Sequence, residues 1–350
     1  MKNRILIYGA YGYAGLLIVE ECIKQQLPII IAGRNESKLK EISDKYSLEY
    51  RTFSLDNIND ISSNLEDIFL VIHCAGPFQY TAFNMVLACL EKGVHYTDIT
   101  GEIDVFEWIA QKDKEAKEKG VMLLPGAGFD VVPSDCLASY LKSLLPDATE
   151  LALAFYSNGK PSHGTMLTGI ESMGTGGRIR RNGILESVPP AYKTRKINFG
   201  EETKLCVTIP WGDVSTAYYS TQIPNIEVYM GVSRSMNILL KGIKLTQNIV
   251  ETETLQSFLK NRVPEGGPSF EERSRNYSLL WGEVKNEQNV YKRAGMKTPD
   301  GYTFTAISSA LIAKKVLEGN FKAGFQTPSN AYGYSLPLEI TGVQLWDIND

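Results

Sequence analysis

The sequence predicts an α/β fold: a Rossmann-like, doubly wound parallel sheet followed by a second domain of α+β type. Three observations support this prediction. Short apolar runs alternate with helical segments over residues 4–124, a glycine-spaced loop follows the first run, and the pattern changes to longer alternating strands after about residue 147. Strands separated by helices of this length require right-handed crossovers and therefore a parallel sheet.

The elements of the first part follow one another in strand–helix order. The first strand, at residues 4–8, is a short apolar run of the kind that is buried on both faces of a parallel sheet. Further strands are expected at 28–32, 51–55, 68–74, 95–98 and 121–124, and helices at 16–25, 36–46, 84–92 and 105–119.

The second part has a different texture. Residues 150–157 alternate in the manner of an antiparallel strand, residues 223–231 form another strand candidate, and residues 251–262 and 307–318 have helical spacing. We therefore divide the chain into a first domain at residues 1–135, a second at 136–300, and a carboxyl-terminal segment at 301–350.

Composition excludes several classes of protein. The 350 residues carry a net charge of −4, which gives no basic surface for nucleic acid. Five cysteines without short paired spacing and three scattered histidines argue against a disulfide framework and a metal site, and they favour a cytoplasmic location. No apolar run reaches the roughly 18 residues of a membrane span, so none is expected.

A glycine-spaced loop is the strongest chemical signal. Gly9, Gly12 and Gly15 form G-x-x-G-x-x-G between the first predicted strand and helix. The first glycine permits a tight turn, the second lets the backbone approach a pyrophosphate, and the third lets the helix pack closely on the sheet. The phosphates would lie at the helix amino terminus, where backbone N–H groups favour anions. A merely glycine-rich turn is the alternative. The expected cofactor contacts are Gly9, Ala10, Tyr11, Gly12, Tyr13, Ala14 and Gly15.

The end of the second strand predicts which dinucleotide binds. NAD requires an acidic residue there, whereas an arginine accommodates the 2′-phosphate of NADP. The sequence has Gly33 and Arg34 at this point, with Asn35 and Lys38 as further candidate contacts, so we expect NADP. A solvated helix start is the alternative. Asp56 is a candidate partner of the adenine amino group, or a cap for the helix that begins near residue 57.

The loop after the fourth strand is expected to lie beside the nicotinamide, because ligands bind beyond the carboxyl ends of parallel strands. Its candidate contacts are Cys74, Ala75, Gly76 and Pro77, with Phe78 toward the substrate. An ordinary turn is an equally good interpretation. His73, at the end of the apolar strand, is a weak candidate proton donor, and a buried, hydrogen-bonded histidine is commoner.

Five segments together resemble the saccharopine dehydrogenase-like family of the reductase type. They are Tyr8-Gly9-Ala10-Tyr11-Gly12-Tyr13-Ala14-Gly15, Ala32-Gly33-Arg34-Asn35, His73-Cys74-Ala75-Gly76-Pro77-Phe78, residues 96–102 (YTDITGE) and residues 125–135 (PGAGFDVVPSD). The resemblance is strong over about residues 4–140. Within the family, the sequence is more similar to bacterial trans-acting enoyl reductase-like members than to lysine-pathway enzymes. The resemblance implies an NADP-binding domain, a second domain whose sheet supports homodimers, and a late helix that returns to the first domain.

The last two segments follow the fifth and sixth strands, so both border the expected nicotinamide end of the cleft. The candidate substrate contacts there are Asp98, Thr100, Gly128, Phe129 and Asp130. Glu102 is a candidate general acid or base if burial raises its pKa, and a structural cap or ion pair is equally compatible. In the second domain, Arg178 with Arg180 and Arg181 can clamp a substrate carboxylate or phosphate, or form a solvated basic loop.

These observations predict an NADP(H)-dependent oxidoreductase. It would transfer a hydride to or from a C=N, C=O or activated C=C bond of a small substrate held between the domains. One alternative is an enoyl reductase that acts on an intermediate bound to a carrier protein. Another is a protein that binds NADP(H) without catalysis.

Overall fold

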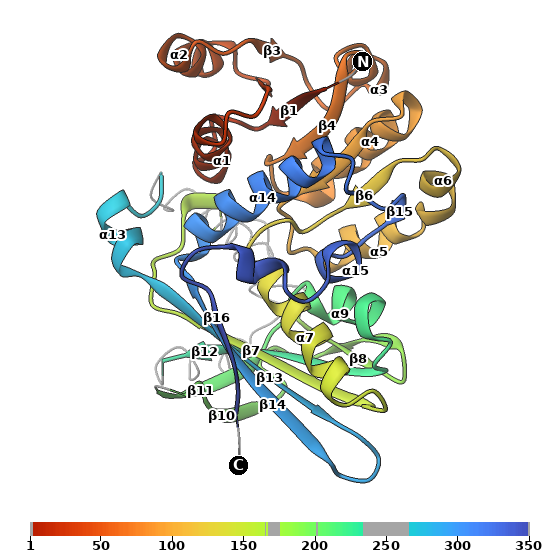
Figure 1. Cartoon of the computed structure of the whole chain (residues 1–350), viewed down its shortest axis with the longest axis vertical. Coiled ribbons are helices and arrows are strands. Elements are labelled where there is room, and N and C mark those ends of the chain that lie inside the picture. The colour runs from red at the N-terminus through yellow and green to blue at the C-terminus, as the bar shows by residue number, and fades with distance from the viewer. Residues whose placement is uncertain (1–2, 165, 167–175, 201, 234–265, 349–350) are drawn as a thin grey trace. The chain divides into compact units, whose positions relative to one another are not determined.

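The computed structural model describes residues 3–164, 166, 176–200, 202–233 and 266–348. The chain forms two compact units. The first comprises Met1–Val132 and Tyr302–Tyr332, and the second comprises Pro133–Gly301 and Gly333–Asp350. The first unit therefore combines the amino-terminal third of the chain with a segment that is distant in sequence (Figure 1).

The first unit is built on a seven-stranded, entirely parallel sheet with the strand order β15-β6-β5-β4-β1-β2-β3. The predicted Rossmann-like fold is thereby confirmed. Its strands are β1 Arg4–Tyr8, β2 Ile29–Gly33, β3 Tyr50–Thr52, β4 Ile68–His73, β5 His95–Asp98, β6 Met122–Leu124 and β15 Gly324–Phe325. The order reverses between β1 and β4, and this switch point is where α/β sheets of this kind bind their ligands.

Helices flank this sheet. They are α1 Tyr13–Lys24, α2 Glu36–Tyr46, α3 Ile58–Ser63, α4 Phe78–Lys92, α5 Ile103–Ala110, α6 Asp113–Glu118, α14 Gly301–Leu317 and α15 Pro328–Tyr332. Successive side chains of a strand point to opposite faces, so Leu6 and Tyr8 of β1 share one face. They join a buried cluster to which α4 contributes Met85 and Val86 and α5 contributes Val105.

The second unit contains a nine-stranded mixed sheet with the path β10-β11-β12-β7-β13-β14-β16, to which β8 and β9 are joined beside β12. Among the strand pairs in the described part of this unit, β7 and β12 run parallel and the others are antiparallel. The strands are β7 Glu150–Ser157, β8 Gly177–Arg181, β9 Ile184–Val188, β10 Thr194–Asn198, β11 Thr203–Thr208, β12 Asn225–Val232, β13 Tyr277–Lys285, β14 Tyr291–Pro299 and β16 Gln344–Asp347. The helices are α7 Val132–Leu144, α9 Asp213–Thr221, α13 Phe270–Arg275 and a 3-10 turn at Leu336–Glu339.

Helix α7 packs closely on one face of this second sheet. At Gly282 in the middle of β13, a Cβ atom would lie 2.5 Å from Cδ1 of Leu141 in α7, so a larger residue here would displace the Leu141 side chain. The opposite face carries a smaller apolar cluster that includes Tyr229 and Trp281.

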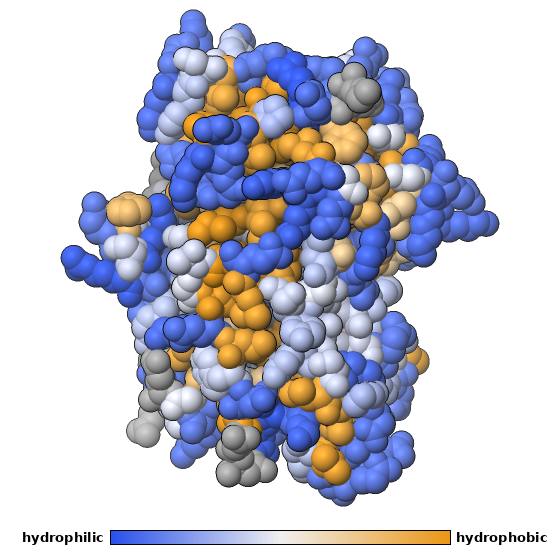
Figure 2. Space-filling view, viewed as in Figure 1, coloured by the Kyte–Doolittle hydropathy of each residue, from blue (hydrophilic) through white to orange (hydrophobic). Residues whose placement is uncertain are grey.

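Some predicted boundaries differ from the structure. The helix expected at 105–119 is two helices, α5 and α6, and the helix expected at 84–92 already begins at Phe78. The helix expected at 251–262 lies outside the described residues. No helix in the described ranges is long and apolar enough to cross a membrane. In the face shown in Figure 2, hydrophilic residues surround smaller hydrophobic areas.

Candidate functional site

The glycine loop lies at the switch point, between β1 and α1. Gly9 adopts a φ of +85°, in the left-handed region that favours glycine, and its N–H donates to the carbonyl of Ala32 at the end of β2 at 2.8 Å. A Cβ atom at Gly9 would lie 2.9 Å from the backbone nitrogen of Ala75, in the loop after β4. The first glycine therefore brings three strand ends together.

The other two glycines shape the start of α1. The N–H of Gly12 donates to the carbonyl oxygen of Gly9 at 3.0 Å, which closes the turn. A Cβ atom at Gly15 would lie only 2.3 Å from that same oxygen, so the helix approaches the loop as closely as glycine allows. Gly12 occupies the N-cap position and no side chain caps the helix. This arrangement fits a pyrophosphate, because backbone donors of the first turn point at the space where a cap would otherwise sit.

The end of β2 carries the residues predicted to select NADP. Arg34 is exposed, and its guanidinium makes no hydrogen bond or ion pair with any described residue. The ring of Tyr11 lies against Gly33, where a Cβ atom would meet it at 2.5 Å, and the Nζ atom of Lys38 lies 5.8 Å from the ring centroid. Arg34, Tyr11 and Lys38 therefore gather around this strand end. Two cationic side chains here suit a phosphate monoester.

Asn35 and Asp56 have other partners in the structure. The Asn35 side chain accepts a hydrogen bond from the backbone N–H of Lys38 at 3.1 Å and thus caps α2. Helix α3 is capped by Asn57, which accepts from the N–H of Asn59 at 2.9 Å. Asp56 is exposed and accepts a hydrogen bond from the Ser54 hydroxyl at 2.5 Å, so it is not the cap. Its contact with adenine stays a prediction.

His73 ends β4 as a buried, neutral side chain. Its Nε2 atom lies 3.0 Å from the Thr81 hydroxyl, which itself donates to the carbonyl of Ala75 at 2.6 Å. That hydroxyl has only one proton, so His73 donates to it through Nε2–H and its Nδ1 is an acceptor. Nδ1 has no partner in the described part of the chain, and burial lowers the pKa of His73 to about 3. Such a histidine is a poor general acid near neutral pH.

Hydrogen bonds also hold the neighbouring loop. The Thr81 hydroxyl also lies 3.1 Å from the carbonyl oxygen of Pro77, so its one proton is shared between the two ends of the Ala75–Pro77 turn, with the shorter contact to Ala75. Burial raises the pKa of the Cys74 thiol, which therefore stays protonated. The residues predicted to line the nicotinamide thus form a fixed, uncharged wall.

Glu102 holds the start of α4. One carboxylate oxygen accepts from the backbone N–H of Phe78 and the other from that of Gln79, both at 2.7 Å. These are the first two residues of the helix, whose N-cap residue, Pro77, provides no side-chain acceptor. A carboxylate at a helix amino terminus is favoured both by these hydrogen bonds and by the helix dipole. Of the two interpretations of Glu102, the structure favours the cap.

Asp98 organises the loops that follow β5 and β6. It is fully buried and accepts hydrogen bonds from the Tyr96 hydroxyl at 2.7 Å and from the backbone N–H groups of Thr100 and Gly126 at 3.0 and 2.8 Å. Burial raises its pKa to about 6, although these donors stabilise the charged form. With Thr100 also buried and accepting from the N–H of Glu102, both residues are positioned to support the loops.

The loop after β6 is held by α14. The Thr305 hydroxyl accepts from the N–H of Phe129 at 3.0 Å, and a Cβ atom at Gly128 would lie 3.0 Å from the same side chain. The Ser308 hydroxyl donates to the carbonyl of Ala127 at 2.7 Å. Sequence reasoning assigned no role to Thr81, Thr305 and Ser308, and it quoted Tyr96 only as part of the segment at residues 96–102, because these contacts appear only when the chain is folded.

Asp130 is the titratable side chain of this loop. It packs against Gly101, where a Cβ atom would lie 3.0 Å from its Oδ2 atom. Burial raises its pKa to about 7. The carboxyl group can therefore both hold and release a proton near neutral pH.

The arginines of the predicted clamp belong to the second unit. Arg178 is half-buried in β8. Arg180 is buried and donates to the carbonyls of Val214 and Gly183, each at 2.9 Å, while its guanidinium stacks over the Tyr218 ring at 4.3 Å. Gly174 and Thr175, which precede these arginines in the basic stretch, lie outside the described residues.

The first unit thus has the features that an NADP-binding domain requires. Residues 5–124 match the family model described as the saccharopine dehydrogenase NADP binding domain. The match is confined to the amino-terminal domain. The match confirms the resemblance noted from the motifs and the expectation that the cofactor is NADP. The glycine cradle and the exposed Arg34 fit that cofactor independently.

Similar proteins extend the comparison. A rat saccharopine dehydrogenase-like oxidoreductase is 28% identical over 213 residues, which is 53% of this chain and 50% of the relative. A trans-acting enoyl reductase of Mycobacterium ulcerans is 27% identical over 193 residues, or 49% of this chain and 44% of the relative. The chain therefore spans about half the length of the curated relatives it matches. Saccharopine dehydrogenase (L-Glu forming) of Saccharomyces cerevisiae shares the fold, with a TM-score of 0.70 at 8% identity over 99% of this chain and 100% of that one.

Proposed function

We propose that this protein is an NADP(H)-dependent oxidoreductase that reduces or forms a C=N, C=O or activated C=C bond in a small substrate. The observation that carries the proposal is the glycine cradle at the switch point together with the exposed guanidinium of Arg34 at the end of β2, which pairs with none of the described residues. One relative named an oxidoreductase and another named an enoyl reductase support it. When bound, the cofactor supplies the hydride, and the protein supplies binding, orientation and proton handling.

The chain's own residues divide these tasks. The backbone of Gly9, Gly12 and Gly15 receives the pyrophosphate, while Arg34, aided by Lys38, binds the 2′-phosphate. The turn at Gly76 and Pro77, which Thr81 fastens, forms the wall beside the nicotinamide. Because this wall is anchored by hydrogen bonds, it orients the cofactor without rearranging.

We assign the transfer of a proton to or from the substrate to Asp130 rather than to His73 or Glu102. Asp130 has its pKa raised to about 7, so either protonation state is accessible at neutral pH. His73 is neutral with its pKa lowered to about 3, and both oxygens of Glu102 are occupied by the amino terminus of α4. Gly128, Phe129, Asp98 and Thr100 would then shape the substrate side of the same loops.

Turnover tests the proposal. Purified protein and NADPH are mixed with each member of a panel of aldehydes, ketones, enoyl thioesters, and pairs of an amine and an oxoacid that form an imine. Oxidation of NADPH is followed by the loss of absorbance of its reduced nicotinamide. Turnover of any member supports an enzyme, and Asp130→Asn should then remove its pH dependence near 7. Tight NADPH binding without turnover across the panel would instead indicate a binding protein that lacks catalysis.

A second candidate function has one specific observation in its favour. The mycobacterial relative is named a trans-acting enoyl reductase, and this name suggests a substrate attached to a carrier protein. If it applies here, an enoyl group on an acyl carrier protein should be reduced much faster than the same group on a short thiol. Equal rates would remove the reason to invoke a carrier.

We further infer a homodimer in the cytoplasm. All five cysteines are free, four of them buried, which suits a reducing compartment. The dimer rests on the family resemblance. Light scattering of the purified protein tests the assembly, and a mass near 38.9 kDa would exclude the dimer.

A further inference from the structure

The second unit carries an open cup on the face of its sheet opposite α7. Strand register brings two polar rows side by side on this face. Glu227 of β12, Ala152 of β7, Glu283 of β13 and Arg293 of β14 form one row, because each is the lateral neighbour of the next. The second row consists of Asn225, Glu150, Lys285 and Tyr291. The small side chain of Ala152 between two glutamates leaves a hollow over β7.

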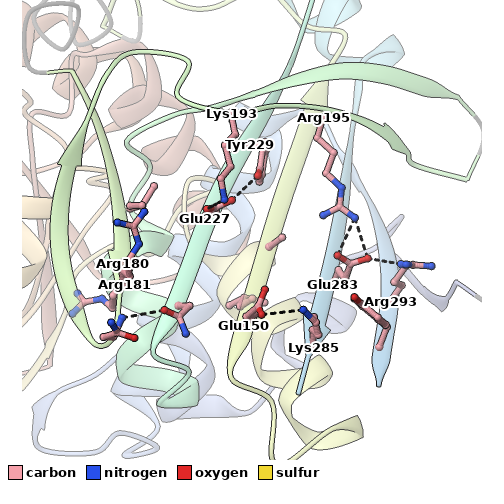
Figure 3. Close-up of a pocket in the computed structure, with 16 residues that line it drawn as sticks. Glu150, Arg180, Arg181, Lys193, Arg195, Glu227, Tyr229, Glu283, Lys285 and Arg293 are labelled. Atoms are coloured by element: carbon pink, nitrogen blue, oxygen red, sulfur yellow. Dashed lines mark hydrogen bonds and ion pairs between the residues drawn. The ribbon is translucent and has the colours of Figure 1, made fainter. Parts of the chain in front are cut away.

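The sheet curls over these rows. Arg195 of β10 donates to both carboxylate oxygens of Glu283 at 2.9 and 3.0 Å, and its guanidinium lies 4.7 Å from the centre of the Trp281 ring. Strands β10 and β13 are four positions apart in the sheet, which is about 19 Å in a flat sheet. An arginine cannot span that distance, so β10 folds across the face and closes one side of a cup of about 710 Å³ (Figure 3).

Cations outnumber carboxylates around the cup. The basic side chains are Arg180, Arg181, Lys193, Arg195, Lys285 and Arg293, and the acidic ones are Glu150, Glu227 and Glu283. The lining thus holds six cationic side chains and three carboxylates, and Glu186 pairs with Arg181 from just outside it. A local surplus of this sign is notable in a chain with a net charge of −4.

The surplus is concentrated where two arginines share one carboxylate. Arg293 donates through Nε to Glu283 at 2.5 Å, on the same side chain that Arg195 binds. The two guanidinium groups together carry more positive charge than the one carboxylate they share, and the Arg195 fork has five N–H donors. Lys285 pairs with Glu150 at 3.2 Å on the neighbouring row (Figure 3). These pairs hold the cationic side chains in place and so lower the entropic cost of ordering them when a ligand binds.

We propose that this cup binds a small polyanion, a molecule that carries a phosphate ester, a pyrophosphate or several carboxylates. Its volume lies within the range of small-molecule pockets. The charged lining excludes an apolar ligand such as an acyl chain, because the ion pairs would be desolvated without replacement. Arginine forks match phosphate and carboxylate oxygens in pairs. The inference is independent of the proposed oxidoreductase activity, because every residue it uses lies in the second unit.

Inorganic pyrophosphate is a suitable probe, with citrate as the carboxylate counterpart. Binding is measured by calorimetry on the full chain in saturating NADPH, which blocks the glycine loop of the first unit. Arg293→Gln and Lys285→Gln remove one cation each, and Lys114→Gln, a 91% exposed side chain of α6, is the matched control. We expect binding to the wild type and the control, and a dissociation constant raised roughly tenfold in each cup variant.

Each outcome decides the proposal. If pyrophosphate binds and citrate does not, the ligand is phosphate-bearing, and if both bind, charge is the shared requirement. If neither binds under these conditions, the proposal is wrong. An affinity for the probe that is unchanged in both cup variants would also overturn the proposal. Binding that appears only when NADPH is absent would overturn it too, because such binding takes place at the glycine loop. Thermal unfolding of each variant shows whether it is folded, and unfolding midpoints close to the wild type validate the comparison.

Discussion

Glu102 offers the sharpest test of a structural role against a catalytic one. Its carboxylate accepts two backbone N–H groups of α4 at 2.7 Å each. Replacing it by alanine leaves both donors without this partner at the amino terminus of a 15-residue helix. Hydrogen bonds to a charged group and helix caps each contribute roughly 1–3 kcal/mol, so we expect Glu102→Ala to lower the free energy of unfolding by about 2–3 kcal/mol.

That loss should be visible in the unfolding temperature. For a domain of 150–250 residues, each kcal/mol corresponds to about 2–4 °C, which predicts a decrease of roughly 4–12 °C. Glu102→Gln keeps one acceptor oxygen but turns an amide NH₂ toward the second donor, so it should recover only a small part of the loss. The control is Glu118→Gln, which removes a 65% exposed carboxylate that lies 3.9 Å from Lys114.

Differential scanning calorimetry and urea unfolding followed by circular dichroism both measure these changes. A Glu102→Ala protein as stable as the control would refute the cap. A Glu102→Gln protein that is fully stable, yet inactive on a substrate that the wild type turns over, would restore Glu102 as a candidate acid or base.

Three further predictions concern the same unit. Gly15→Ala should abolish thermal stabilisation by NADPH, because its Cβ atom would lie 2.3 Å from the carbonyl oxygen of Gly9; retained stabilisation would contradict the close approach. His73→Gln should gain stability relative to the wild type as the pH falls from 6 to 4, by about 1.4 kcal/mol per pH unit. The sign follows because the unfolded chain protonates His73 below a pH of about 6.5, whereas the buried side chain, with a pKa of about 3, stays neutral. Urea unfolding of both proteins at several pH values measures this difference. Free energies of unfolding that change with pH in parallel for the two proteins would disprove the prediction. Asp130→Asn should flatten the pH dependence of kcat/KM near 7, and an unchanged inflection would assign that proton to another group.

The sheet of the first unit was predictable because its signals are local. Each buried strand is a short apolar run, and Gly9, Gly12 and Gly15 mark the turn between β1 and α1. The start of α4 was not predictable in this way, since its capping carboxylate comes from Glu102, 24 residues later. The two-residue strand β15 is similarly hidden, because it exists only through its pairing with β6, some 200 residues earlier in the chain.

The residues of the candidate site likewise differ in whether their signal is local in the sequence. Arg34 could be named from its place after β2, because the absence of an acidic residue there is itself a local pattern. The chemistry of His73, Asp98 and Asp130 depends on burial and on partners such as Thr81 and Tyr96, and it emerges only when the strand ends are brought together. The cationic cup was also hidden, since it results from the register of β12, β7, β13 and β14.

The most direct test of the central claim is a titration of the wild-type protein and Arg34→Ala with NADPH and with NADH, followed by calorimetry. We expect the wild type to bind NADPH more tightly. Arg34→Ala should raise the dissociation constant for NADPH by roughly 10- to 100-fold, which corresponds to the loss of charged hydrogen bonds, and should leave that for NADH nearly unchanged. A wild type that prefers NADH, or equal losses for both cofactors, would contradict the assignment of Arg34 to the 2′-phosphate.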